Sequence, residues 1–181
     1  FILIIKGLTA LSPEDVGSLR IESASLVLIP FALRNLRKVK KENWKFLISV
    51  GFAGSLIPAF LFAIAQTQLK SAVVGILNAL VPLFTVLIAS LIYKHHPSRR
   101  VYGGVIVGFL GSIVLILAGN NGGLGSINPY MLLIVLATLF YATNLNLIKE
   151  HLQGLKSITI TSISLLLVGP IASIYLFGFT E

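Results

Sequence analysis

The sequence contains no cysteine, and this absence removes several kinds of chemistry at once. The chain can form no disulfide, and it offers neither a thiolate nucleophile nor a thiolate metal ligand. Acidic residues are also scarce, at 6 against 14 Lys and Arg. Enzymes need clustered acids, bases, nucleophiles or metal ligands. The sequence therefore disfavours an enzyme, and we expect no cofactor, no metal and no catalytic residue.

Charge of either sign is low as well. Only 11% of the residues are charged and 56% are hydrophobic, with a mean hydropathy of +0.95. A soluble domain carries about 25% charged residues. The composition predicts an all-α membrane protein. We expect a multi-spanning helical bundle that is embedded in the lipid bilayer. The net charge of +8 lies in short loops, so it indicates topology signals rather than a nucleic-acid partner.

Long apolar runs define the expected spans. The predicted helices cover residues 16–33, 46–66, 71–93, 101–118, 130–148 and 158–179. Residues 1–5 read as the end of an earlier helix, because the chain opens with Phe inside an apolar run. We interpret the sequence as a fragment of a longer protein, with an uncharged, Gly- and Asn-rich linker at 119–128.

The loop charges alternate along the chain. Loops 34–45, 94–100 and 149–156 carry six, three and two Lys or Arg, whereas the opposite loops carry only Lys6 and Lys70. Cytoplasmic loops are enriched in these residues. We therefore expect all three basic loops in the cytoplasm, and the protein in the cytoplasmic (plasma or inner) membrane.

The span 71–93 has a polar stripe. It is long enough to cross a bilayer, at about 35 Å against a hydrocarbon core of about 30 Å. Its small or polar residues recur every three or four positions, on one helical face: Ser71, Gly75, Asn78, Pro82, Thr85 and Ala89. Such a face favours either close helix packing or the lining of a cavity. The Asn78 amide would be costly in lipid without a hydrogen-bond partner. Pro82 lacks an N–H, so it leaves one backbone carbonyl of the helix without its usual donor.

Other spans add candidates for the same cavity. Arg20 and Glu22 lie inside the span 16–33, where charges face protein, water or the interface. Two positions apart, they point to different sides of the helix. Tyr141 and Asn144 share a face of the span 130–148, and Phe62 lies at a depth similar to that of the stripe.

Glycines and histidines support simpler interpretations. Gly104, Gly108 and Gly111 form a flat face that we expect to pack against another helix. His95 and His96 lack nearby acids or thiols, so we expect a solvated loop rather than a metal site. His151 is interpreted as a loop end in the same way.

Two segments of the chain look alike. Residues 3–12, LIIKGLTALS, are similar to residues 145–157, LNLIKEHLQGLKS. The copies lie five helices apart, so the second would enter the membrane inverted, a pattern found in secondary transporters.

A family resemblance rests on Leu19-Arg20, on the run Asn-Ala-Leu-Val-Pro-Leu-Phe-Thr at 78–85, and on Gly104 and Gly111. With these residues the chain resembles the drug/metabolite transporter superfamily, EamA type. The resemblance implies ten helices in two inverted five-helix repeats. Residues 1–118 would form the first repeat, 119–128 a periplasmic or extracellular linker, and 129–181 the start of the second. Many members have Glu where this chain has His95.

These observations together predict a secondary transporter. We expect an exporter that moves a small metabolite or amphiphilic solute by alternating access. The alternative is a non-transporting assembly or structural subunit whose glycine face meets a partner. Association into a homo-oligomer stays open, and the sequence specifies neither substrate nor coupling ion.

Overall fold

The computed structural model describes residues 1–119 and 128–178, with side chains 115–119 excepted. Across these residues every regular element is a helix, which confirms the predicted all-α fold. Most of the linker predicted at 119–128 lies outside the described residues.

The first elements are α1 (Ile2–Gly7) and α2 (Pro13–Asn35). The start of α2 is fixed by a capping box: the Asp15 N–H donates to Ser12 Oγ at 3.1 Å, and the Ser12 N–H donates to Asp15 Oδ2 at 3.2 Å. Each side chain thus satisfies a backbone donor that the first turn of a helix leaves free. Two short 3₁₀ turns, Leu36–Lys38 and Lys41–Asn43, follow α2.

The span predicted at 46–66 is interrupted. It consists of α3 (Trp44–Gly51), a π-helical turn (Phe52–Leu56) and α4 (Ile57–Ala65). Pro58 has no N–H, and its ring would clash with the carbonyl four residues earlier, at Gly54. The widened π turn ahead of Pro58 relieves that clash.

The prediction of one continuous helix over 71–93 is also wrong in one respect. It is broken into α5 (Ser71–Asn78) and α6 (Val81–Leu91). Ala79 and Leu80 donate to the carbonyls of Ile76 and Leu77, three residues back and 3.0 Å away in both cases. Since Pro82 cannot donate to the Asn78 carbonyl, the α-helical ladder fails here and tightens into a turn.

Three longer helices complete the described chain: α7 (Arg99–Gly119), α8 (Tyr130–His151) and α9 (Ser157–Gly178). Within the described residues, five segments are long and apolar enough to cross a membrane: Pro13–Lys38, Lys41–Ala65, Ser71–Leu91, Tyr130–His151 and Ser157–Gly178. They bear out five of the six predicted spans. The sixth forms a 21-residue helix, α7, but is not among these five.

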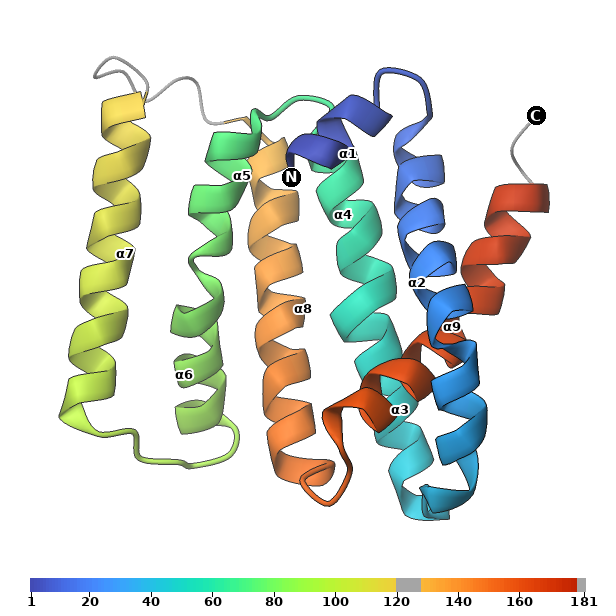
Figure 1. Ribbon diagram of the computed structural model, residues 1–181. Coiled ribbons are helices and arrows are strands. Elements are labelled where there is room, and N and C mark those ends of the chain that lie inside the picture. The colour runs from blue at the N-terminus through green and yellow to red at the C-terminus, as the bar shows by residue number, and fades with distance from the viewer. Residues whose placement is uncertain (120–127, 179–181) are drawn as a thin grey trace.

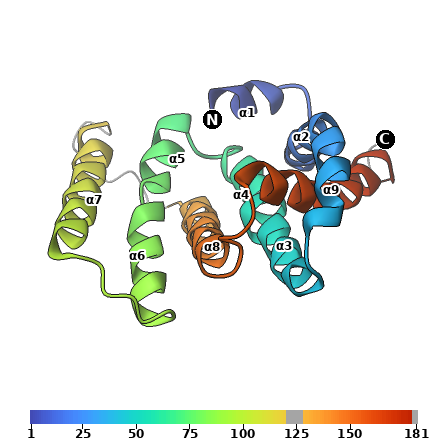
Figure 2. The same ribbon diagram turned by 60° about the horizontal axis from the view of Figure 1, so that its bottom comes forward.

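The helices lie side by side in an elongated bundle. Figures 1 and 2 show α7 at one edge, then the α5–α6 pair, α8 and the α3–α4 segment, with α2 and α9 crossing at the other edge. Small residues allow this crossing, because Gly169 of α9 lies directly against Ser25 of α2. The Ser25 hydroxyl also donates to the Leu165 carbonyl at 3.2 Å. Close backbone approach and interhelical hydrogen bonds are the means by which membrane helices associate.

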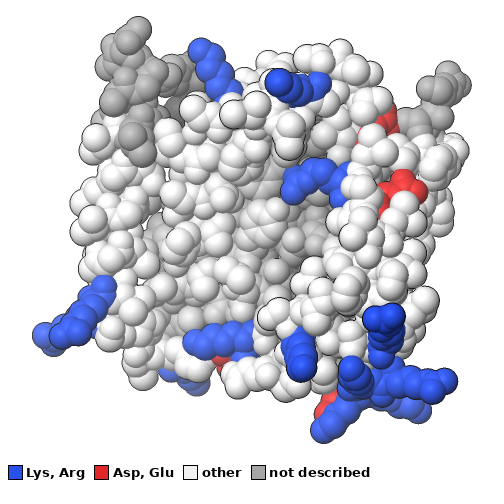
Figure 3. Space-filling model, in the orientation of Figure 1, with Lys and Arg blue, Asp and Glu red and all other residues white. Residues whose placement is uncertain are grey.

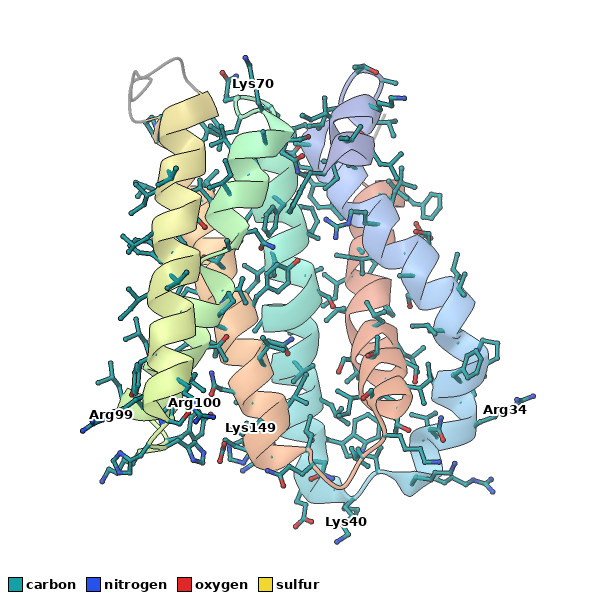
Figure 4. The ribbon with its side chains drawn as sticks, turned by 60° about the vertical axis from the view of Figure 1, so that its left-hand side comes forward. Arg34, Lys40, Lys70, Arg99, Arg100 and Lys149 are labelled. Atoms are coloured by element: carbon teal, nitrogen blue, oxygen red, sulfur yellow. The ribbon has the colours of Figure 1, made fainter. Side chains whose placement is uncertain are left out.

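Basic side chains gather at one end of the bundle, as Figure 3 shows. Figure 4 places Arg34, Lys40, Arg99, Arg100 and Lys149 at that end and Lys70 at the other. The three basic loops therefore lie together, as their charge pattern predicts. This end is called the basic end below.

The glycine face of α7 differs from its prediction. A Cβ atom added at Gly104, Gly108 or Gly111 would meet nothing within 4 Å. Gly104 and Gly108 instead border a cavity of about 360 Å³ shared with Ala79 and Pro82. The described helices thus do not make the close contact expected of this face, because a cavity separates α7 from the α5–α6 break.

Candidate functional site

A central cavity opens on one face of the bundle. It has a volume of about 460 Å³, and Figure 3 shows this face hollowed. Its walls come from α1 and the residue before it, and from α2, α4, α5 and α8. The lining residues are Phe1, Leu3, Ile4, Val16, Arg20, Phe62, Asn78 and Tyr141. Four of the predicted cavity residues therefore meet in one place: Arg20, Phe62, Asn78 and Tyr141.

A second cavity of about 490 Å³ adjoins the first, and Asn78 and Tyr141 line both. Its other walls include Pro82 and Asn144, two more of the predicted residues, and Ala79 in the break between α5 and α6. The broken helix therefore lies at the cavity wall, the arrangement in which irregular backbone is tolerated at membrane depth.

The amide oxygens of Asn78 and Asn144 are buried and have no hydrogen-bond partner within the described structure. A buried acceptor without a partner costs free energy, and most such atoms in proteins are satisfied. Both residues line one cavity, but each oxygen is itself enclosed, so a donor that enters the cavity reaches it only when the amide turns.

The position of Asn144 depends on the π turn. A Cβ atom at Gly54 would collide with the Asn144 carboxamide, so the glycine leaves the room that this side chain occupies. The widened turn forced by Pro58 and the absence of a side chain at Gly54 thus together seat the amide. π turns occur frequently at functional sites.

Aromatic rings form the apolar part of the central cavity. The Phe62 ring lies between those of Phe1 and Tyr141, with centroids 5.4 and 5.7 Å away. The guanidinium of Arg20 lies near the Tyr141 hydroxyl, close enough for the two groups to interact electrostatically. A cation, a hydroxyl and aromatic rings therefore lie within one space.

Glu22 lies apart from this space. Its carboxylate accepts a hydrogen bond of 3.4 Å from Ser173 in α9, whereas Arg20 lines the cavity. The two charges thus lie on different sides of α2, as their spacing predicts, and Glu22 does not line the cavity in which we expected it.

Thr85 also falls outside the central cavity. Its hydroxyl donates to the Val81 carbonyl of its own helix at 2.7 Å. Its carbonyl accepts from Asn146 Nδ2 at 3.1 Å, which ties α6 to α8. Asn146 is almost fully buried, and the sequence signal that could have singled it out is its position inside an apolar span.

At the basic end, two histidines make contacts that sequence reasoning missed. His95 Nε2 lies 2.7 Å from Glu150 Oε1, which links the loop after α6 to the end of α8. The His151 ring stacks on Phe46 at a centroid distance of 3.9 Å. His95 lies in a partly exposed loop and the exposed His151 ends α8, as predicted, but both rings also have partners. Local spacing does not reveal these partners, because they lie 55 and 105 positions away in sequence.

A third cavity of about 470 Å³ lies under this loop, bordered by His95, His96 and Lys149. Leu145 lines both this cavity and the one beside Asn144. Cavities with shared walls thus follow α8 from Tyr141 toward the basic end.

Comparison with known proteins decides the family. Residues 1–117 match the EamA-like transporter family. The chain belongs to this family. It is also similar to the uncharacterized transporter YdfC of Bacillus subtilis (strain 168), with 25% identity over 150 residues, 80% of this chain and 48% of the relative. The chain thus spans about half the length of the curated relative that it matches. No solved structure matches it.

The apolar helices and the family together indicate a multi-pass membrane protein of the EamA-like transporter family. The residues that carry the resemblance, at 78–85, form the broken helix at the cavity wall.

Proposed function

We propose that the complete protein is a secondary transporter that exports a small metabolite or amphiphilic solute by alternating access. The solute would bind in the central cavity, where Asn78 and Tyr141 stand between the two adjoining cavities. This role requires a space that is both apolar and polar, and the lining of the central cavity combines apolar side chains with the polar side chains of Arg20, Asn78 and Tyr141.

One observation carries the proposal: Asn78 closes α5 at the break, and its buried oxygen has no partner among the described residues. In a helix that served only packing, a transmembrane amide would hydrogen-bond to a neighbouring helix. An unpartnered acceptor beside a cavity is instead consistent with a partner that comes and goes.

Orientation and direction extend the same proposal. We place the basic end in the cytoplasm of a cell whose plasma or inner membrane holds the protein, following the positive-inside rule. The cavities that follow α8 toward Lys149 would then be part of the cytoplasmic route. A second, inverted repeat would complete the walls, and residues 129–181 would be its beginning.

The test is a transport assay on the complete protein in proteoliposomes, with a panel of radiolabelled metabolites and amphiphiles and with empty liposomes as the control. Accumulation that depends on the protein and saturates with solute is the expected result. If no member of a broad panel is moved while the protein copurifies with other membrane subunits, the assembly role replaces this proposal.

A further inference from the structure

Arg20 is a charge for which the described structure provides no acid. Lys40 forms an ion pair with Glu42 at 3.8 Å, and His95 contacts Glu150 at 2.7 Å, but neither pair lines the central cavity. Glu22, the acid nearest to Arg20 in sequence, bonds to Ser173 on the other side of α2. The charge that lines the cavity is therefore not neutralised by any acid of the described chain.

The donors of Arg20 are only partly used. A guanidinium has five N–H donors; those of Arg20 lie near the Tyr141 hydroxyl, and the Arg20 side chain is otherwise exposed. A guanidinium also presents its donors as a planar fork that matches the two oxygens of a carboxylate. Charges inside a span face protein or water and mark binding sites. Arg20 and Tyr141 together thus offer donors to an anionic group inside the central cavity.

On the α5 side, the same cavity is bordered by hydrogen-bond acceptors rather than donors. Asn78 Oδ1 and, beside the adjoining space, Asn144 Oδ1 are buried acceptors without partners. A carboxylate oxygen can only accept, so it cannot satisfy them. An N–H or O–H donor elsewhere on the bound molecule satisfies these oxygens when the amides turn toward it, and the apolar side chains that line the central cavity favour an apolar part.

We propose that the solute is a small organic carboxylate that carries a hydroxyl or N–H donor and an apolar body, with its carboxylate on Arg20 and its donor on Asn78. This inference rests on the proposed function, because it assigns the chemical class of the solute bound in that cavity. Each of the three groups matches one feature of the cavity wall. The carboxylate matches the unpaired cation, the donor matches the unpartnered amide oxygen, and the apolar body matches the aromatic ring.

Three related compounds test these features on the purified complete protein. Mandelate has the carboxylate, a hydroxyl and a phenyl ring; mandelamide lacks the charge, and phenylacetate lacks the hydroxyl. Affinity is measured by isothermal titration calorimetry. We expect mandelate to bind roughly tenfold or more tighter than mandelamide, since a hydrogen bond between two charged groups is stronger than one to a neutral amide. Phenylacetate should bind more weakly than mandelate.

Variants assign the effects to residues. Arg20→Gln should abolish the preference for mandelate over mandelamide, and Arg20→Lys, which keeps the charge, should retain part of it. Asn78→Leu should abolish the preference for mandelate over phenylacetate but not the preference over mandelamide. Equal binding of mandelate and mandelamide by the unmodified protein, no binding of mandelate, or an unchanged preference in a folded Arg20→Gln protein overturns the inference.

Transport separates this inference from the function on which it rests. If liposomes accumulate uncharged solutes and carboxylates equally, the function stands and the solute class is wrong. If mandelate binds with the expected preferences but no solute of any class is moved, the solute class stands and transport is wrong.

Discussion

Gly54 is the residue on which the placement of Asn144 depends. A methyl group there would collide with the carboxamide, so Gly54→Ala should displace it. Overpacking of a rigid core costs about 1–3 kcal/mol, and we expect a smaller cost here because the Asn144 amide can rotate away. The midpoint of thermal unfolding of the detergent-purified protein should therefore be lower for Gly54→Ala than for a glycine with free space around it. Gly108→Ala is the matched control, because a Cβ at Gly108 meets nothing within 4 Å. Equal effects of the two substitutions would contradict the predicted contact between Gly54 and Asn144.

The contact between His95 and Glu150 should be weak but measurable. Their side chains are 42% and 20% exposed, so solvent screens the pair. A double-mutant cycle with His95→Ala and Glu150→Ala should give a coupling of roughly 0.5 kcal/mol at neutral pH, the magnitude of partly exposed pairs. Thermal unfolding of the four proteins measures it. Strict additivity of the two substitutions would show that the loop after α6 is not held to α8 by this pair.

At the scale of elements, the break between α5 and α6 is the feature that Pro82 explains. Pro82→Ala restores an N–H that can donate to the Asn78 carbonyl, which favours one continuous helix. We expect transport by the complete protein to fall while thermal stability is kept or raised. Pro30→Ala is the control, because α2 continues through Pro30 without a break. Full transport by Pro82→Ala would mean that the break has no part in the cycle.

The elements themselves were largely predictable, and their irregularities were not. Apolar runs of about 20 residues predict membrane helices, and the capping box at Ser12 follows directly from its sequence. Pro58 and Pro82 mark places where a helix must adjust, but the form of the adjustment depends on neighbours. One becomes a π turn beside Asn144 and the other a break beside a cavity.

The sequence predicts which candidate residues share a helical face, but it does not predict which faces meet around one cavity. Helical spacing put Asn78 and Pro82 on one face and paired Tyr141 with Asn144, and the structure brings these faces together. Spacing does not say which neighbour a face meets. Glu22 therefore lies against α9 and Thr85 lies nearer the basic end, although both carry chemistry suited to the cavity.

For the whole molecule, the clustering of basic loops predicts a topology that cysteine labelling can test. The described chain has no cysteine of its own, so Lys70→Cys and Lys40→Cys introduce single thiols at opposite ends. In intact cells that produce the complete protein, with any cysteines elsewhere replaced, a membrane-impermeant maleimide should label position 70 and not position 40. Permeabilised cells should show labelling at both. Labelling of position 40 in intact cells would reverse the orientation.

The central claim is that Asn78 binds the solute in the central cavity. The most direct measurement is proteoliposome transport by Asn78→Leu in the complete protein, compared with Thr143→Leu. Thr143 bonds to the Leu139 carbonyl of its own helix and lines neither cavity that contains Asn78. Because leucine is favourable in lipid, both variants should insert normally. The account predicts that transport is lost in Asn78→Leu and kept in Thr143→Leu; full transport by a normally inserted Asn78→Leu protein would contradict it.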